Sequence, residues 1–161
     1  LNELDLIRKY QNLFSIASQD TFLIDGTLKD NITFGSDKSF SENKIKESIK
    51  FARLNNFVDS LELGLDTHIG STIKQLSSGQ KQRIAIARSI YSDREILIFD
   101  EATNALDEEN EKIIFKNING LRSKKTIIII THNLENLKIC KRIISIQNQE
   151  IIEKKNEKYK Y

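Results

Sequence analysis

The spacing of apolar and polar positions predicts a strand near the start of the chain and a group of helices after it. Apolar side chains alternate loosely over Phe14–Ala17, which predicts a short strand that runs into a loop at Gln19. From Ser41 onward, apolar side chains recur at the spacing of an amphipathic helix, with Ser41 as its cap. We therefore expect residues 28–64 to form a small helical segment that is interrupted at Asn55–Asn56.

A second pattern, in the middle of the chain, marks the start of a helix. Ser77 and Gln80 have the Ser-x-x-Gln form of a capping box, in which the Ser77 hydroxyl accepts a hydrogen bond from the Gln80 amide and the Gln80 side chain reaches back. This pattern predicts a helix that begins there and runs to about Tyr91.

The last third of the chain alternates between strand and helix. Continuous apolar runs occupy Glu95–Phe99 and Thr126–Ile130, and between them Asp107 is placed to cap a helix. Such runs are typical of parallel strands that are buried on both faces, so we expect an α/β fold. Two further short strands are predicted at Arg142–Ile146 and Glu150–Glu153.

Composition places the chain among ordinary globular proteins and argues against several classes of function. Lys and Arg number 25 against 23 Asp and Glu, and the net charge of +2 is too small to indicate a nucleic-acid partner. The apolar runs are far shorter than the roughly 20 residues that cross a bilayer. A single cysteine, Cys140, excludes an internal disulfide and suits a reducing compartment. Because the chain contains no Met, we expect it to be the C-terminal part of a longer protein.

Two neighbouring carboxylates follow the first of the late strands. Asp100 and Glu101 come directly after Ile96–Phe99, at the edge where open parallel sheets place their ligands. One such carboxylate can hold Mg²⁺ against phosphate oxygens while the other polarises an attacking water. A solvated acidic turn is the alternative interpretation, and the neighbouring motifs argue against it.

The residues from Leu76 to Arg88 form a motif that is more specific than a helix cap. Glycine and small hydroxyl side chains at Ser77–Gln80 suit a phosphate, because the first turn of a helix offers amides that bulky side chains do not cover. The string Leu-Ser-Ser-Gly-Gln-Lys-Gln-Arg-Ile-Ala-Ile-Ala-Arg strongly resembles the signature motif of the ATP-binding cassette (ABC) ATPases. Ser78 stands where that motif has glycine, and we expect its side chain to weaken close contact with phosphate.

The resemblance extends over nearly the whole chain, with the motifs in the family's order. It implies that Gln19 is the Q-loop residue that senses the metal and the attacking water, that Asp100 holds Mg²⁺ and that Glu101 is the general base. It also implies that His132 is the switch residue that reaches the γ-phosphate. Asp107 ends an Asn-Ala-Leu-Asp stretch that resembles the D-loop, which touches the opposite protomer.

ATP and Mg²⁺ are the cofactors that the resemblance implies. The positions expected to contact the nucleotide are Ser77, Ser78, Gly79, Gln80 and Asp107. A P-loop requires Gly-x-x-x-x-Gly-Lys-Ser/Thr, yet none of the six glycines is followed by lysine, so the chain has no Walker A motif. We therefore expect an incomplete, P-loop NTPase-like parallel sheet core with a small helical signature subdomain.

The motifs also divide the chain, taken as one partial ABC ATPase domain over residues 1–161. We expect a helical and signature subdomain at about 20–92, followed by the Walker B, D-loop and H-loop part of the core at 93–153. Residues 154–161 are expected to be a solvated tail. His68 has no motif around it and is expected at the surface, and Cys140 is expected to pack on a helix face.

The segment after the Q-loop, Asp20–Ile32, resembles that of exporter-type cassettes. In that branch an apolar patch receives a coupling helix of the membrane domain, and the candidates here are Phe22, Leu23 and Ile24. Burial of the same three side chains in the core is the alternative. The Gly-Glu-x-Gly stretch that exporters tend to carry is replaced at Gly70–Ile73, where the acidic residue is absent.

The sequence thus predicts the nucleotide-binding domain of an ABC exporter, which couples ATP hydrolysis to transport of a lipid, oligosaccharide or peptide-like substrate. The implied partners are a second ABC ATPase domain, in a head-to-tail dimer, and a transmembrane domain, with no nucleic acid. The implied location is the cytoplasmic face of the inner membrane, with this part of the protein itself soluble.

Two alternatives remain open at this point. A soluble ABC-type ATPase of DNA repair carries a long coiled coil or zinc modules between the Q-loop and the signature, and residues 19–76 show neither pattern. A non-catalytic, truncated cassette is favoured by the missing Walker A motif, whereas Glu101 and His132 favour a functional protein.

The missing P-loop leads to a direct test on this chain. Because the P-loop lysine and amides supply most of the grip on the β- and γ-phosphates, we expect millimolar MgATP to leave the Tm of the 161-residue chain unchanged. Thermal unfolding with and without MgATP measures this. A clear rise in Tm would reveal a phosphate site that none of the motifs predicts.

Overall fold

The computed structural model describes residues 2–36, 39–69 and 76–156 of the chain. The chain forms two compact units, Leu1–Ile130 and Thr131–Tyr161. The Gly70–Ile73 stretch, where the acidic coupling residue was predicted to be absent, lies outside the described residues. Within the described ranges, no helix has both the length and the apolar character needed to cross a bilayer.

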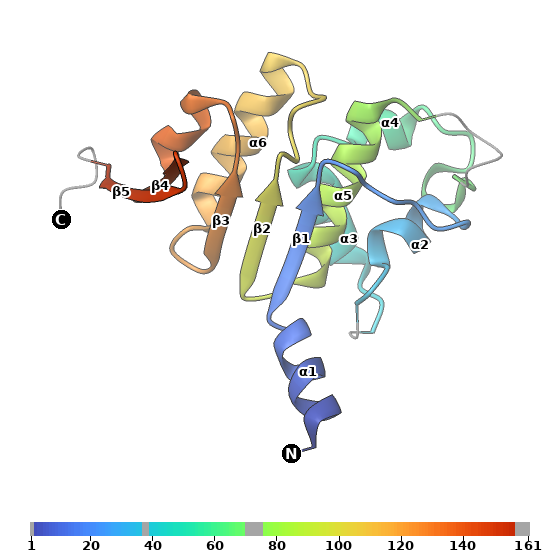
Figure 1. Ribbon diagram of the computed structural model, residues 1–161. Coiled ribbons are helices and arrows are strands. Elements are labelled where there is room, and N and C mark those ends of the chain that lie inside the picture. Colours follow the sequence, from blue (N-terminus) through green and yellow to red (C-terminus); the bar gives the residue numbers. More distant parts are fainter. Residues whose placement is uncertain (1, 37–38, 70–75, 157–161) are drawn as a thin grey trace. The chain divides into compact units, whose positions relative to one another are not determined.

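Three parallel strands form the sheet of the first unit (Figure 1). They are β1 (Phe14–Ser18), β2 (Ile96–Asp100) and β3 (Thr126–Ile130), in the order β1-β2-β3. All three strands agree with the sequence prediction to within a residue or two, and the α/β class is confirmed. Because parallel neighbours need a crossover, the long segments between these strands contain the helices of the unit.

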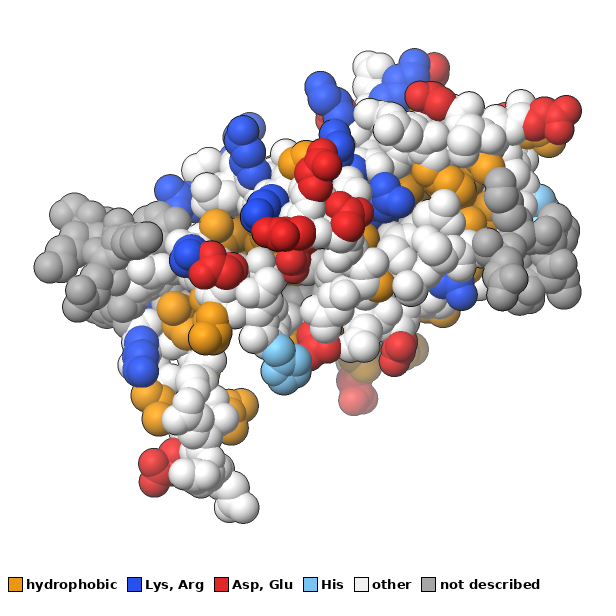
Figure 2. Space-filling view, turned by 90° about the horizontal axis from the view of Figure 1, so that it is seen from above, with side chains coloured by type: hydrophobic (Ala, Val, Ile, Leu, Met, Phe, Trp, Pro, Cys, Tyr) orange, Lys and Arg blue, Asp and Glu red, His pale blue; other side chains and the backbone are white. Residues whose placement is uncertain are grey.

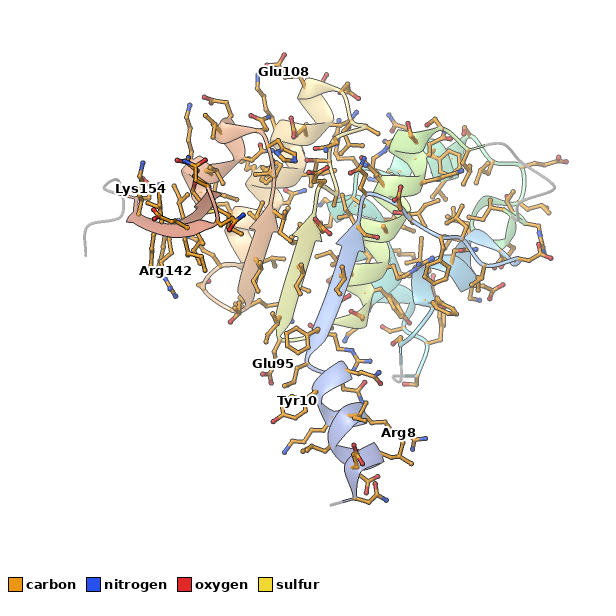
Figure 3. All side chains as sticks on the ribbon, in the orientation of Figure 1. Arg8, Tyr10, Glu95, Glu108, Arg142 and Lys154 are labelled. Atoms are coloured by element: carbon orange, nitrogen blue, oxygen red, sulfur yellow. The ribbon has the colours of Figure 1, made fainter. Side chains whose placement is uncertain are left out.

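The helices of this unit lie mainly between the strands. They are α1 (Glu3–Gln11), α2 (Leu28–Thr33), α3 (Glu42–Phe51), α4 (Asn55–Asp59), α5 (Ser78–Ser92) and α6 (Glu108–Leu121), with a short 3-10 turn at Gly64–Asp66. The predicted caps are confirmed, since the side chains of Ser41, Ser77 and Asp107 each accept a backbone amide hydrogen bond. The α1 helix was not predicted, and Arg8 and Tyr10 project from it at the lower end of the view (Figure 3).

The break in the helical segment falls earlier than the sequence predicted. Helix α3 ends at Phe51, and Asn55 begins α4 instead of interrupting a helix. The chain turns at Arg53, whose φ of 59° is left-handed, and the amide of Leu54 donates to the carbonyl of Ile49 at 2.9 Å. This is the Schellman arrangement, which usually has glycine at the left-handed position. An arginine there leaves no signal in the sequence.

One face of the sheet differs from the prediction that the strands are buried on both sides. Helix α5 packs against β1, and Figure 1 shows α5 and α6 on the same side of the sheet. On that side Leu97 and Phe99 are fully buried. On the other side, in register, Ile16 is 58% exposed and Ile128 is 44% exposed. The prediction was therefore wrong for this face, because the helices of the described chain cover only one side.

The second unit is a small antiparallel hairpin preceded by a 3-10 helix, Leu134–Ile139. Its strands are β4 (Arg142–Gln147) and β5 (Glu150–Lys155), joined by a turn with two left-handed residues. Both strands were predicted, and β5 runs two residues past the predicted end at Glu153. Cys140 follows the 3-10 helix as its C-terminal cap and is half-buried, so it does not lie on a helix face.

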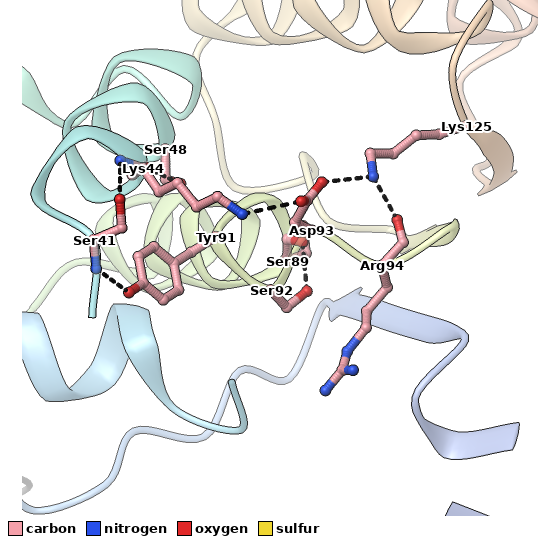
Figure 4. A network of polar contacts seen from close by, with 9 residues as sticks. All are labelled: Ser41, Lys44, Ser48, Ser89, Tyr91, Ser92, Asp93, Arg94 and Lys125. Carbon is pink, nitrogen blue, oxygen red and sulfur yellow. Dashed lines mark hydrogen bonds and ion pairs between the residues drawn. The ribbon is translucent and has the colours of Figure 1, made fainter. Parts of the chain in front are cut away.

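A charged network ties the far end of α5 to its neighbours (Figure 4). Asp93 follows α5 in a left-handed conformation with φ 55°, and its carboxylate accepts from the Nζ of Lys44 on α3 at 3.0 Å. The Nζ of Lys125, just before β3, lies 2.8 Å from the same carboxylate and also donates to the Arg94 carbonyl. Lys125 is only 19% exposed, so this ion pair is screened less than one at the surface.

This network generates a stability prediction. The substitution Asp93→Asn keeps a residue that tolerates left-handed φ but removes both ion pairs, so we expect the free energy of unfolding to fall by about 1 kcal/mol at low salt. Urea denaturation at low and high salt measures the loss, which should shrink as salt screens the charges. Asp59→Asn is the matched control, because the described part of the chain offers the Asp59 side chain no ion pair. A loss that does not depend on salt would contradict an electrostatic role.

Candidate functional site

The predicted site residues Gln19, Asp100 and Glu101 lie at one edge of the sheet. Ser18 pairs with Asp100 in the register of β1 and β2, so Gln19 and Glu101 each follow directly after a paired position. The carboxyl ends of all three strands meet at this edge, where α/β sheets bind their ligands. Figure 2 looks onto it from above and shows Asp and Glu side chains gathered near the middle, with Lys and Arg side chains beside them.

Glu101 has an unusual backbone conformation for its residue type. Its φ is 49°, in the left-handed region that a glutamate rarely adopts, and its amide donates to the Ile130 carbonyl on β3 at 3.0 Å. Its carboxylate accepts from the Asn104 side-chain amide at 2.9 Å. Left-handed non-glycine residues cost free energy and persist where their surroundings hold them, commonly at functional sites.

The signature turn begins α5 with the predicted capping box. The Gln80 amide donates to the Ser77 hydroxyl at 3.2 Å, and the Ser77 amide donates to Oε1 of Gln80 at 2.9 Å. Ser77 and Ser78 are exposed. The box therefore fixes the direction of the helix while the small side chains of its first turn face solvent.

Gly79 is required by packing inside the chain. A Cβ at this position would lie 2.9 Å from the backbone carbonyl oxygen of Ala105, and 3.5 Å from a methyl carbon of Leu106. The first turn of α5 thus rests directly on the stretch that resembles the D-loop. The sequence reasoning assigned glycine in this motif to close approach of phosphate and missed this contact.

Gln82 is a further site residue that the sequence reasoning missed. It is only 3% exposed, and its amide bonds the backbone of Glu101 and of Ala105. The residue stands inside the recognised signature string, but only the packing of α5 on residues 101–105 reveals its partners.

Asp107 caps α6 and is exposed to solvent. The Asn110 amide donates to Oδ1 of Asp107 at 2.9 Å, and the Asn110 side chain donates to Oδ2 at 2.6 Å. These hydrogen bonds hold the pKa of the Asp107 carboxyl below its usual range, with a smaller contribution from the charge of Arg83. Arg83 itself donates to the carbonyls of Arg53 and Gly79, which links α5 to the turn after α3.

A hollow of about 460 Å³ brings the Q-loop and the signature turn together. It is lined by Gln19 and its neighbours Asp20, Thr21 and Phe22, and by Ser78 and Lys81 of α5. Gln19 and Ser78, which are far apart in the sequence, therefore face the same space in one chain.

Of the three residues predicted to form a docking patch, only Phe22 is exposed. It is 60% exposed, whereas Leu23 and Ile24 are half-buried. The ring of Phe22 meets that of Phe34 edge-on at 5.5 Å, and the Arg88 guanidinium lies 5.0 Å from the Phe22 ring and 5.4 Å from the Phe34 ring. Burial lowers the pKa of Arg88 without making it neutral at physiological pH.

The two histidines lie in different places. His132 belongs to the second unit, follows β3 and is exposed. His68 is exposed, as predicted, and its Nδ1 lies 3.7 Å from a carboxylate oxygen of Asp25.

The donor set at the sheet edge fits Mg²⁺ only in part. Within the described residues, no cluster of three or more His, Cys, Asp or Glu side chains could hold a metal ion alone. Asp100 and Glu101 supply one or two carboxylates, and Mg²⁺ is commonly bound by such a minimal set with water and substrate phosphates completing its shell. The residues therefore fit an ion that arrives with a phosphate ligand, and Asp100 stays the predicted donor.

Comparison with known proteins agrees with the class that this fold and site define. A family model described as ABC transporter matches residues 3–104, and the chain belongs to this family. The resemblance inferred from the motifs is confirmed.

The relatives include flippases and a drug-resistance protein. The chain is 41% identical over 145 residues to ATP-dependent lipid A-core flippase 2 of Colwellia psychrerythraea, an alignment that covers 90% of this chain and 25% of the flippase. It is also 41% identical over 146 residues to multidrug resistance protein 1 of Plasmodium falciparum, covering 89% of this chain and 10% of that protein. The chain thus spans about a quarter of the flippase's length.

A solved structure shares the fold. The structure of a bacterial Atm1-family ABC exporter with ATP bound matches with a TM-score of 0.83 and 32% identity, covering 90% of this chain and 25% of that one. The α/β sheet and its helices are therefore those of an ABC exporter's cassette region.

The Gly79 contact generates a test with a control on another helix. We expect Gly79→Ala to lower the free energy of unfolding by about 1–3 kcal/mol, because the new methyl group meets a backbone oxygen that cannot move alone. Gly120→Ala is the control, since nothing lies within 4 Å of its added Cβ, and we expect it to raise the free energy of unfolding by about 0.5–1 kcal/mol. Chemical denaturation of the two variants measures both. Equal effects would show that the Ala105 contact is unimportant.

Proposed function

We propose that this chain is part of the ATPase domain of an ABC exporter and that the longer protein couples ATP hydrolysis to transport. The observation that carries the proposal is the arrangement at the edge of the sheet. Asp100 ends β2, Glu101 follows it, and the signature turn Ser77–Gln80 packs on the residues after them. Membership of the ABC transporter family supports the same conclusion.

The roles of the residues follow from their chemistry. Asp100 would hold Mg²⁺, which neutralises charge on the phosphates when bound. Glu101 would accept a proton from the attacking water, with Asn104 orienting its carboxylate at 2.9 Å. Gln19 follows β1 at the same edge and would sense the metal and the water. His132 would reach the γ-phosphate as the switch residue.

The signature turn would act on a nucleotide held by a second ABC ATPase domain. The first turn of α5 is exposed at Ser77 and Ser78, and a helix N-terminus favours anions. In a head-to-tail dimer Ser77–Gln80 would cap the γ-phosphate held by the P-loop of the partner domain. Asp107, which is exposed at the start of α6, would touch that partner.

Phe22 and Phe34 would receive the transmembrane domain. Both rings are more than 40% exposed and are held by the same guanidinium, so they present a fixed aromatic surface next to the Q-loop. The transported substrate would be a lipid, oligosaccharide or peptide-like molecule, and the names of the flippase relatives favour a lipid. The domain would lie at the cytoplasmic face of a cell membrane.

The alternatives have less support. Between the Q-loop and the signature, the described residues fold into the short helices α2–α4, not into the coiled coil of a soluble repair ATPase. A non-catalytic cassette remains the second candidate for the 161 residues taken alone, because they contain no Walker A lysine.

Substitution of Glu101 tests the proposal. In the full-length transporter we expect Glu101→Gln to keep ATP binding but to lower the hydrolysis rate by about 10²–10⁴, since the water loses its base. Phosphate release and nucleotide binding, measured on the same preparation, separate the two effects. Glu95→Gln is the control, because Glu95 lies at the opposite end of β2 (Figure 3). A Glu101→Gln protein with a near-normal rate would refute the assignment of the base.

A further inference from the structure

The Gln82 side chain connects α5 to the backbone on both sides of the predicted catalytic turn. Its Oε1 accepts from the Ala105 amide at 2.9 Å, and its Nε2 donates to the Glu101 carbonyl in a longer bond of 3.4 Å. The side chain is 3% exposed. One buried amide thus bonds both ends of the turn formed by residues 101–105.

A neutral amide can make this pair of bonds because it carries both a donor and an acceptor. One partner is a carbonyl, which needs a donor, and the other is an N–H, which needs an acceptor. Because the buried Gln82 side chain bonds both ends of the turn from the helix side, it also fixes the turn. Gln82 therefore determines where the backbone between Glu101 and Ala105 lies.

The backbone conformation of Glu101 depends on the hydrogen bonds that hold its two peptide groups. A φ of 49° is unfavourable for a glutamate and needs its neighbours to hold it. The peptide on the amino side of Glu101 is fixed by the bond from its amide to Ile130, and the peptide on the carboxyl side by the bond from Gln82. The left-handed backbone aims the side chain, so releasing one peptide allows the carboxylate to move.

We propose that Gln82 is a positioning residue for hydrolysis, which holds the Glu101 peptide and the Ala105 amide so that the signature turn and the catalytic carboxylate of the same chain move together. The inference rests on the proposed function. It adds a route within one chain: contact at Ser77–Gln80 reaches Glu101 through the next turn of α5, where Gln82 lies. Gly79, which packs against the Ala105 carbonyl, is a second contact between α5 and the same turn.

The experiment uses two variants of nearly equal size in the full-length transporter. Gln82→Met removes both hydrogen bonds, and Gln82→Glu, in its ionised form, keeps the acceptor for Ala105 but loses the donor to Glu101. We expect both to lower kcat for ATP hydrolysis about five- to tenfold, the factor that matches one or two lost hydrogen bonds, with KM for ATP within about twofold. Ser89→Ala is the control, because it removes a buried hydroxyl from the same helix without touching residues 101–105.

A double substitution separates positioning from general stability. If Gln82 acts through Glu101, adding Gln82→Met to Glu101→Gln should leave the residual single-turnover rate unchanged. The inference would be overturned if the two substitutions lowered the single-turnover rate additively or if kcat were unchanged in both Gln82 variants. A fall in kcat accompanied by a rise in KM and a fall in Tm would also overturn it. Failure of both Gln82 variants to fold would also overturn it, in favour of a structural role. If the unmodified transporter does not hydrolyse ATP, the proposed function itself fails, which is a different result.

Discussion

The packing of α5 on residues 101–105 is the contact on which the rest of the site depends. Gly79 allows the helix to approach the Ala105 carbonyl, and Gln82 hydrogen-bonds the backbone of the same turn. A larger residue at the first position would push the helix away, and an apolar residue at the second would remove both hydrogen bonds to the turn. The signature turn and the carboxylates after β2 therefore occupy fixed positions relative to each other.

The C-terminal half of α5 is held against the segment after the Q-loop by hydrogen bonds and ring contacts. The Arg88 guanidinium donates to the carbonyls of Asn31 and Phe22, and it also meets two aromatic rings. Asn31 is fully buried, and its side chain exchanges hydrogen bonds with the Ile24 backbone in both directions. A single helix of 15 residues thus contacts the turn of residues 101–105 near its start and the exposed aromatic surface near its end.

The sequence predicted structure correctly where the residues that form an element and those that stabilise it lie in one short motif. The capping box at Ser77, the cap at Asp107 and the apolar runs of the strands each predict structure from local chemistry, and each prediction is confirmed. The hydrogen bonds of Gln82 reach backbone groups 19 and 23 positions away, so no local pattern could reveal them. Helix α1 was missed although the Asn2 side chain caps it. None of its residues is buried, so the helix forms without packing on the core of the chain.

The uncovered side of the sheet has a consequence for how the chain folds. Parallel strands gain their stability mainly from layers packed on both faces, and apolar surface left in water forfeits about 25 cal/mol for each Å² that a second layer would bury. Here Ile16 and Ile128 remain largely in solvent while Leu97 and Phe99 are sealed beneath α5 and α6. Any additional layer that buried Ile16 and Ile128 would therefore add directly to the free energy of unfolding of this sheet.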